Sequence, residues 1–177
     1  AFARRQNLDP KPTDVPALVA DMNDLMRRSL GPAFSLDTNL PGRLPPALTD
    51  ANQLEAALLN LVVNARDAMP QGGAIAITGR EETVAEDSAL KPGRYVVITV
   101  ADNGEGMDAE TLARASDPFF TTKGIGKGTG LGLSMVQGLA EQSGGRLVLA
   151  SRIGEGTTAE LWFPMAAEGA AAADRDA

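Results

Sequence analysis

The sequence predicts an α/β two-layer sandwich, in which a mixed, largely antiparallel sheet of about five strands is covered on one face by about three helices. Two long segments repeat apolar residues at helical spacing, and short apolar runs bounded by glycine or proline lie between them. With 177 residues, of which 44% are hydrophobic, the chain can bury the core of one domain. Aromatic residues make up only 4%, so aliphatic side chains must fill most of that core.

The helices are predicted from apolar periodicity and from residues that favour helix ends. Helices are expected over about 14–30, 51–69 and 131–142. Asp14 and Asp50 can cap the first two, because a carboxylate accepts the unpaired N–H groups of a first helical turn. Gly31–Pro32 ends the first helix. The second helix has a stripe of residues expected to be buried: Leu54, Leu58, Leu61, Val62, Ala65 and Met69.

The strands are predicted from shorter apolar runs, expected at 33–40, 48–49, 74–78, 94–101, 146–150 and 157–163. The run 94–101 is apolar on both faces apart from Tyr95 and Thr99, as a central strand should be. In the last strand Ala159, Leu161 and Phe163 are expected to face the core. Residues 81–92 are expected to form a charged hairpin connection.

The chain outside these elements is expected to form flanking pieces. Residues 1–8 are interpreted as the end of a helix that belongs to something longer, followed by a proline-rich linker over 8–12. Residues 9–165 are expected to form the domain. The alanine-rich segment 166–177 is interpreted as a linker or disordered tail.

Composition excludes several classes of function. A net charge of −7 argues against nucleic acid or direct membrane contact as the main interaction. Cysteine is absent, which fits the reducing cytoplasm. No apolar stretch approaches the roughly 20 residues of a membrane span, and no signal peptide is visible. Histidine is absent too, so this chain supplies no histidine base, metal ligand or phosphoacceptor.

A candidate base pocket begins at Asp102, where an apolar strand gives way to the sequence Asp-Asn-Gly-Glu-Gly-Met. A carboxylate only accepts hydrogen bonds, which suits the exocyclic amine of adenine. Gly104 and Gly106 permit positive φ and a close approach of the backbone to a ligand. These residues predict an adenine pocket at the end of the strand.

A candidate phosphate site follows in the glycine-rich segment 124–132, which should be mobile because glycine is costly to order. The segment opens onto the helix expected at 131–142, whose first N–H groups can bind an anion. A P-loop is excluded because Gly128, and not serine or threonine, follows Gly126-Lys127. The segment 104–109 fits a dinucleotide fingerprint, but the acidic residue expected about 20 positions later is missing.

A third candidate feature lies on the second helix, where Asn60, Asn64 and Asp67 share one face. Asparagine is a poor helix former, and its amide oxygen is a suitable ligand for Mg²⁺. On this helix alone, a solvated polar face explains the same spacing. Beside the glycine segments, a magnesium site is the favoured interpretation.

Four motifs, in this order and spacing, resemble those of sensor histidine kinases. They are the N box (NLVVNARDA, 60–68), the first glycine box (DNGEGM, 102–107), the F box (DPFFTTK, 117–123) and the second glycine box (GKGTGLGLS, 126–134). The sequence GEGTTAELWFP (154–164) is similar to the closing strand of the same domain. The wider group comprises the GHKL ATPases, which include gyrase, MutL and the heat-shock chaperones. The resemblance covers about residues 8–165 and implies the Bergerat fold with a flexible ATP lid.

The resemblance also implies roles for individual residues. Asn64 corresponds to the asparagine that holds Mg²⁺, and Asp102 to the residue that reads the adenine amine, with Thr157 near it through ordered water. Further residues implied to contact ATP are Arg66, Asp67, Gly104, Gly106, Met107, Phe120, Lys123, Gly128, Thr129, Gly130, Leu131, Gly132 and Leu133. Phe119 and Phe120 are equally explained as residues that anchor the lid to the core.

Two positions depart from related patterns. Asn60 stands where the gyrase-like ATPases carry a catalytic glutamate, so water activation should be slow and transfer to a protein side chain favoured. Asn60 is thus a candidate catalytic residue and a possible second ligand of Mg²⁺. Asp67 stands where many kinases carry a phosphate-binding lysine, and Arg66 or Lys123 could supply the missing charge.

The function that the resemblance implies is that of a protein-histidine kinase. The domain would bind Mg-ATP and transfer the γ-phosphoryl group to a histidine on a separate dimerisation domain, for relay to an aspartate of a response regulator. The parent could be a hybrid kinase with its own receiver domain, anchored to a membrane or soluble. Without the dimerisation helices, the isolated domain is expected to be a monomer.

Two other functions compete with this one. A GHKL protein that phosphorylates serine or only hydrolyses ATP would share the same boxes. A degenerate domain that acts as a scaffold is disfavoured by the intact Asn64, Asp102 and glycine boxes.

Overall fold

The chain folds around one main sheet and its helices. The computed structural model describes residues 8–86, 90–115 and 132–166. The elements in chain order are β1 (Lys11–Thr13), α1 (Val15–Leu30), β2 (Phe34–Asn39), β3 (Ala47–Thr49), α2 (Ala51–Asp67), β4 (Gly73–Val84), β5 (Gly93–Asp102), α3 (Ala109–Arg114), α4 (Gly132–Gln142), β6 (Arg146–Arg152) and β7 (Gly156–Pro164).

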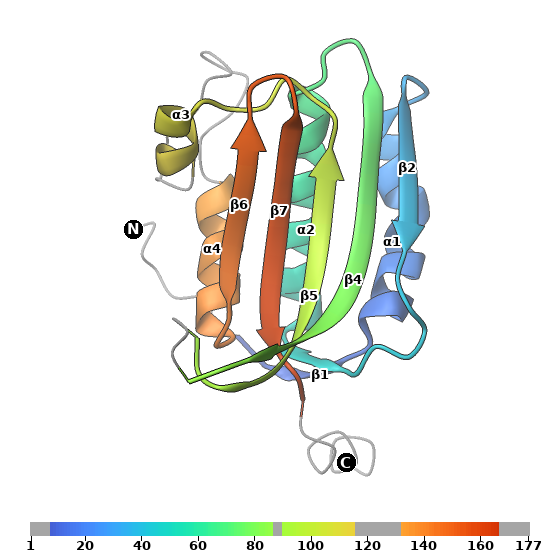
Figure 1. Cartoon of the computed structure of the whole chain (residues 1–177). Coiled ribbons are helices and arrows are strands. Elements are labelled where there is room, and N and C mark those ends of the chain that lie inside the picture. Colours follow the sequence, from blue (N-terminus) through green and yellow to red (C-terminus); the bar gives the residue numbers. More distant parts are fainter. Residues whose placement is uncertain (1–7, 87–89, 116–131, 167–177) are drawn as a thin grey trace.

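The main sheet has five strands in the order β2-β4-β5-β7-β6. β2 pairs with β4 in parallel, and the other neighbouring pairs are antiparallel. Helices α1, α2 and α4 cover one face, and α3 lies beside the end of β6 (Figure 1). The predicted two-layer sandwich is confirmed, and α3 adds a short fourth helix within the described ranges.

The predicted helix starts are confirmed by their hydrogen bonds. Asp14 accepts from the Ala17 N–H at 3.1 Å. Asp50 accepts from the N–H groups of Asn52 and Gln53 at 3.0 and 3.2 Å. Each carboxylate pairs N–H groups that the first helical turn leaves without an intrahelical acceptor, which fixes where α1 and α2 begin.

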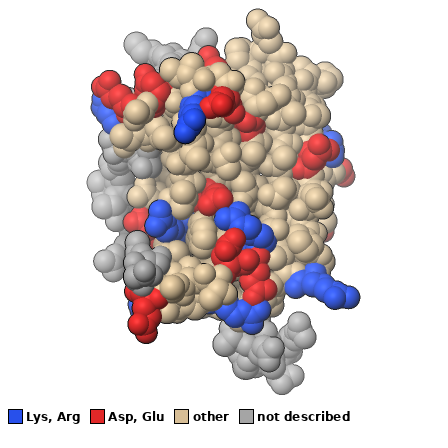
Figure 2. All heavy atoms as spheres, viewed as in Figure 1, with Lys and Arg blue, Asp and Glu red and all other residues tan. Residues whose placement is uncertain are grey.

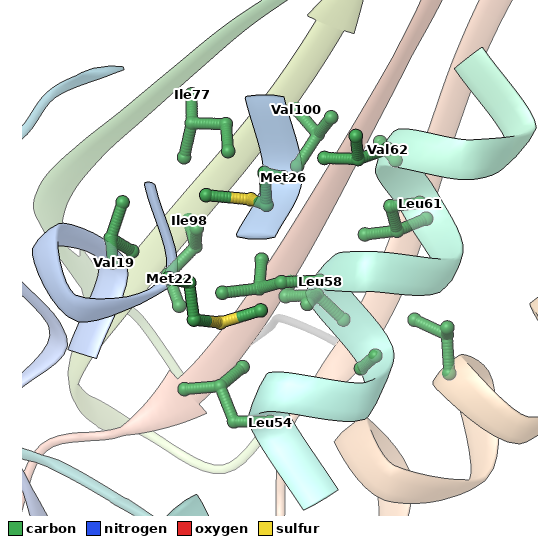
Figure 3. Packing of buried hydrophobic residues seen from close by; sticks show 14 of the residues in the cluster. Val19, Met22, Met26, Leu54, Leu58, Leu61, Val62, Ile77, Ile98 and Val100 are labelled. Atoms are coloured by element: carbon green, nitrogen blue, oxygen red, sulfur yellow. The ribbon is translucent and has the colours of Figure 1, made fainter. Parts of the chain in front are cut away.

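The core lies between the sheet and the helices (Figure 3). Leu58 and Val62 of α2 meet Met26 of α1 and Ile98 of β5, and all four side chains are fully buried. Phe163 of β7 is fully buried as well, as its inward register predicts. Aliphatic and methionine side chains thus dominate the packing. None of the helices in the described part of the chain has the length and apolar composition needed to cross a bilayer.

The opposite face of the sheet is open, and acidic and basic side chains intermingle on it (Figure 2). Arg80 bonds Glu82 at 2.7 Å and Glu160 at 3.2 Å, and its guanidinium lies 5.7 Å from the centre of the Trp162 ring. Val97 is paired with both Arg80 and Trp162 and is fully buried. This arrangement explains why β5 is apolar on both of its faces.

Three local features differ from the sequence prediction. Residues 11 and 12, predicted as linker, form β1 together with Thr13. This strand pairs with β3 in a two-stranded sheet, and an edge strand of this kind tolerates Pro12. β4 continues to Val84 through residues predicted as a connection, because β5 offers it a partner along that length. Helix α3, capped by Asp108, is too short for its apolar residues to show a helical repeat in the sequence.

Helices α2 and α4 are joined at the end of the domain that carries β1 and β3. The Asp9 N–H donates to Asp50, the cap of α2, at 3.0 Å. One residue earlier, the buried Thr49 hydroxyl lies 3.0 Å from the hydroxyl of Ser143, which directly follows α4. The Thr13 hydroxyl donates to the Thr49 carbonyl at 3.0 Å. These bonds hold the start of α2 and the end of α4 together.

Candidate functional site

The candidate site begins with a row of residues that crosses the helix-facing side of the sheet. The register places Ile75 of β4 opposite Asp102 of β5, and Thr157 of β7 opposite Ser151 of β6. Ala101 pairs with Thr158, so Asp102 and Thr157 are the next neighbours in the row. The row is apolar at Ile75 and polar from Asp102 onward. Polar groups therefore gather where β5, β7 and β6 meet, at the same end of the sheet as the start of α4 (Figure 1).

Asp102 is held in this row by backbone hydrogen bonds. Its Oδ1 accepts from the Gly104 N–H at 2.9 Å and from the Thr157 N–H at 3.2 Å. Burial raises the pKa of the Asp102 carboxyl above its usual value, and the two N–H donors partly offset this effect. In the described residues these hydrogen bonds reach only Oδ1, so Oδ2 can accept from a ligand.

Two glycines make the close backbone contacts around Asp102 possible. Gly106 has φ 73° and Gly156 has φ 82°. A Cβ on Gly106 would overlap the carbonyl oxygen of Arg152, and a Cβ on Gly156 would overlap that of Asp102. Both positions therefore need glycine for space as well as for conformation.

Ser151 connects the segments around the carboxylate, although the sequence did not single it out. Its hydroxyl accepts from the Met107 N–H at 2.8 Å and donates to the Gly156 carbonyl at 3.0 Å. It also lies 2.8 Å from the hydroxyl of Thr157. The register of the β6–β7 hairpin is the feature that could have identified Ser151, because the turn at Gly154 and Gly156 places it directly opposite Thr157.

Asn103 is a second residue that the sequence reasoning passed over. Its side-chain Oδ1 accepts from the Ala74 N–H at 2.9 Å, and its own N–H donates to the Ala74 carbonyl at 3.3 Å. Asn103 thus continues the pairing of β5 with β4 by one residue and fixes the direction in which the chain leaves Asp102.

Asn60 and Asn64 of α2 lie beside the start of α4. A Cβ built on Gly132, the first residue of α4, would lie 3.6 Å from Asn64 Nδ2 and 3.8 Å from Asn60 Oδ1. Leu133, the next residue, packs against the core. The structure therefore brings Asn60, Asn64 and the first turn of α4 together. The polar row that contains Asp102 lies at the same end of the helix layer.

Arg66 and Asp67 lie at the end of α2, where they pair with each other at 3.2 Å. Arg66 also donates to the carbonyl of Ser29, near the end of α1, at 2.9 Å. The bond to Ser29 joins α2 to α1. A phosphate contact by Arg66 or Asp67 remains a prediction, and for Arg66 it would compete with these bonds.

The remaining predicted contacts fall in the F box and second glycine box. Residues outside the described ranges are Phe120, Lys123, Gly128, Thr129, Gly130 and Leu131. Nothing in the structure bears on their roles or on the predicted lid.

A metal at this site would have to be held by few protein ligands. Across the described ranges, no group of three or more histidine, cysteine, aspartate or glutamate side chains is placed to bind a metal. Asn60 and Asn64 offer amide oxygens instead. Such a donor set fits Mg²⁺ that is shared with substrate phosphates, because this ion commonly keeps only one or two protein ligands.

The sandwich, the carboxylate at the end of β5 and the asparagines beside α4 define a nucleotide-binding class of domain. The chain belongs to the family described as histidine kinase-, DNA gyrase B- and HSP90-like ATPases, which matches residues 49–167. The resemblance stated from the sequence motifs is thereby confirmed.

Sensor kinases are among the chain's relatives. It is 42% identical over 169 residues to the sensor kinase CckA of Brucella abortus, covering 93% of the chain and 18% of that protein. It is 37% identical over 164 residues to the sensor histidine kinase ZraS of Escherichia coli, covering 88% of the chain and 32% of that protein. The chain thus spans a third or less of these relatives.

Solved structures share the fold. Full-length ShkA in complex with AMPPNP superimposes with a TM-score of 0.74 at 27% identity, covering 93% of this chain and 34% of that one. The mycobacterial sensor histidine kinase MprB gives a TM-score of 0.68 at 21% identity, covering 89% and 98%. The second comparison supports the fold alone.

Replacing Gly106 by alanine should disrupt the Asp102 pocket. The new Cβ would meet the Arg152 carbonyl and would also sit at positive φ, so we expect a loss of about 2–4 kcal/mol in unfolding free energy, measured by urea denaturation. Gly154→Ala is the matched control, since Gly154 has φ 83° with no atom within 4 Å of its Cβ position. It should cost only about 1 kcal/mol. Equal losses in the two variants would contradict the role of close packing at Gly106.

Proposed function

We propose that this chain is the ATP-binding catalytic domain of a sensor histidine kinase. It binds Mg-ATP and transfers the γ-phosphoryl group to a histidine on a separate dimerisation domain, for relay to an aspartate of a response regulator. Membership in the ATPase family and similarity to sensor kinases support this proposal. One observation carries the proposal: a half-buried carboxylate and a pair of asparagines lie at the same end of the domain. A nucleotide bound there can reach from the carboxylate to the asparagines.

The base end of the site is Asp102. Its Oδ1 is occupied by two backbone N–H groups, so Oδ2 is available to the exocyclic amine of adenine. Thr157 stands beside it and reaches the base through an ordered water. Gly104, Gly106 and Met107 line the turn that bounds the pocket. The positive φ of Gly106 keeps this turn close to the β6–β7 hairpin.

The phosphate end is the region between Asn60, Asn64 and the first turn of α4. The first N–H groups of α4 lack intrahelical acceptors and favour an anion. Asn64 would hold Mg²⁺, with Asn60 as a possible second ligand, and the ion would neutralise charge on the phosphates. The second glycine box and Lys123 would complete this end of the site.

The proposed chemistry is transfer and not hydrolysis. Asn60 lies beside Gly132 and stands where the gyrase-like ATPases carry a catalytic glutamate, but an amide does not accept a proton at neutral pH. The chain therefore contributes position and electrostatics, and the incoming nucleophile must come from elsewhere. Since the sequence contains no histidine, a phosphohistidine can form only on another domain or chain.

The same proposal covers organisation and partners. Residues 1–8 would belong to the dimerisation and phosphoacceptor region, residues 9–165 to the catalytic domain and residues 166–177 to a linker. The partners would be that upstream domain and a response regulator or receiver domain. The domain would act in the cytoplasm, as a monomer when isolated.

Replacing Asp102 by asparagine should weaken the binding of ATP without unfolding the chain. Asparagine keeps an oxygen for the two N–H donors but can place an amide against the adenine amine, so we expect a loss of about 2–3 kcal/mol in binding, measured by calorimetry. Asp37→Asn, an exposed carboxylate on β2, should bind as the wild type does. Wild-type affinity in Asp102→Asn would remove Asp102 from its proposed role.

The same variant has an expected pH signature without nucleotide. Because the pKa of Asp102 is raised in the folded chain, its folded state holds the proton to higher pH than its unfolded state does. Stability contributed by this group is therefore lost as pH rises through the folded pKa. At pH 7, Asp102→Asn should melt at the same temperature as the wild type or higher.

Replacing Asn64 by alanine should reduce the dependence of ATP binding on magnesium. Loss of one amide ligand should weaken the binding of Mg-ATP by about 1–2 kcal/mol and leave the binding of magnesium-free ATP nearly unchanged. Titrations with and without the ion measure both. Asn52→Ala, an exposed asparagine at the start of the same helix, is the control. An identical magnesium response in wild type and Asn64→Ala would count against this ligand.

The proposed reaction can be tested by adding a separate phosphoacceptor domain and ATP labelled in its γ-phosphate. A histidine kinase should give an acid-labile, base-stable phosphoprotein, and Asp102→Asn should reduce its yield. An acid-stable product would indicate the alternative, a GHKL-type serine kinase. Release of inorganic phosphate with no labelled protein would indicate a simple ATPase.

A further inference from the structure

Strand β3 has a bonded neighbour on each of its two sides. On one side it pairs with β1, where Thr13 lies opposite Ala47. On the other side Ala47 forms a β-bridge with Met165, which directly follows β7. The next residue, Ala166, donates its N–H to the Pro46 carbonyl at 2.8 Å. The segment that enters the domain and the segment that leaves it therefore meet on the same short strand.

The same strand is bonded to helices α2 and α4. Among the residues that the structure describes, the buried threonines and serines are Thr13, Thr49 and Ser143, and all three lie here. The Thr13 hydroxyl donates to the Thr49 carbonyl, and the Thr49 hydroxyl lies 3.0 Å from that of Ser143. A buried hydroxyl that loses its partner is costly, so these contacts fix β3 against the start of α2 and the end of α4.

Helices α2 and α4 pack against each other, so contacts at one end of the pair affect the spacing at the other end. Thr49 and Ser143 lie at the start of α2 and the end of α4. Asn64 lies in the last part of α2, next to Gly132 at the start of α4. The distance between the two helices at the phosphate end of the site therefore depends on the contacts at β3.

The base end of the site is built from other elements. Asp102 ends β5, and its two N–H donors are Gly104 in the turn that follows and Thr157 on β7. These contacts lie at the end of the sheet opposite β1 and its partner β3 (Figure 1). A change at β3 should therefore alter the phosphate end and leave the base end as it is.

We propose that β3 couples the entering segment 9–13 and the leaving segment 165–166 to the phosphate end of the nucleotide site. While both segments are bonded to β3, Asn64 stays close to the first turn of α4. When either segment is released, α2 and α4 separate there and hold the phosphates and Mg²⁺ less tightly. The inference rests on the proposed function, since it concerns the phosphates of the bound nucleotide. In the proposed kinase these segments lead to the dimerisation domain and to the linker, so either one regulates the site.

The test compares the binding of Mg-ATP to the full 177-residue chain and to three variants by calorimetry. Asp9→Pro removes the N–H that bonds the cap of α2, and Ala166→Pro removes the N–H that bonds the residue before β3. A double variant, Thr49→Val with Ser143→Ala, removes the hydroxyl pair without leaving one partner unpaired. Each variant should bind Mg-ATP about three- to tenfold more weakly, the worth of one hydrogen bond. Thr38→Val, an exposed threonine on β2, is the matched control and should bind as the wild type does.

NMR spectra of the same variants separate this coupling from a general loss of structure. The amide signals of Gly104 and Thr157, which report the base end, should keep their wild-type positions in all three variants. An unchanged affinity for Mg-ATP in a variant that folds, or a displaced signal from either amide, would overturn the inference. If a proline variant does not fold, the double variant decides by the same two measurements. Failure of the wild type to bind Mg-ATP would instead refute the proposed function.

Discussion

The Asp102 carboxylate at the end of β5 must be kept in the sheet without losing both of its oxygens to protein donors. The structure meets this constraint by directing the N–H groups of Gly104 and Thr157 to one oxygen. Since those donors come from segments far apart in sequence, the carboxylate also fixes how the turn after β5 lies against the start of β7. Gly106 and Gly156 allow that approach, because any larger residue would overlap a carbonyl. One polar interaction thus shapes the whole pocket.

Helix α2 serves the core and the site at the same time. Leu58 and Val62 are fully buried against α1 and the sheet, while Asn60 and Asn64 lie next to the first residue of α4. The helical repeat separates these two sets, so the apolar side fixes the position of the polar side. A domain built in this way needs no long loop to place its asparagines. Their position follows from packing, which is more rigid than a loop would be.

The sequence was informative where local chemistry decides the outcome. Asp14 and Asp50 cap their helices as predicted, and the alternation in β7 identified Phe163 as inward-facing. It was uninformative where contacts distant in sequence decide. β1 exists because β3 pairs with it, and β4 continues past its apolar part because β5 accompanies it. Ser151 was missed for the same reason, since its partners lie on β7 and after β5 and nothing in its own neighbourhood indicates them.

The bonds near β1 and β3 have a mechanical consequence for the site. Thr49 and Ser143 join the start of α2 to the end of α4, and the chain at Asp9 holds the cap of α2. The site lies between the other ends of these two helices, away from these hydrogen bonds. If α2 and α4 move apart, the separation is therefore greatest where Asn64 lies next to Gly132 and smallest at Thr49 and Ser143. A force that reached Asp9 along the polypeptide would act first on the hydrogen-bonded ends of the helices, far from the asparagines.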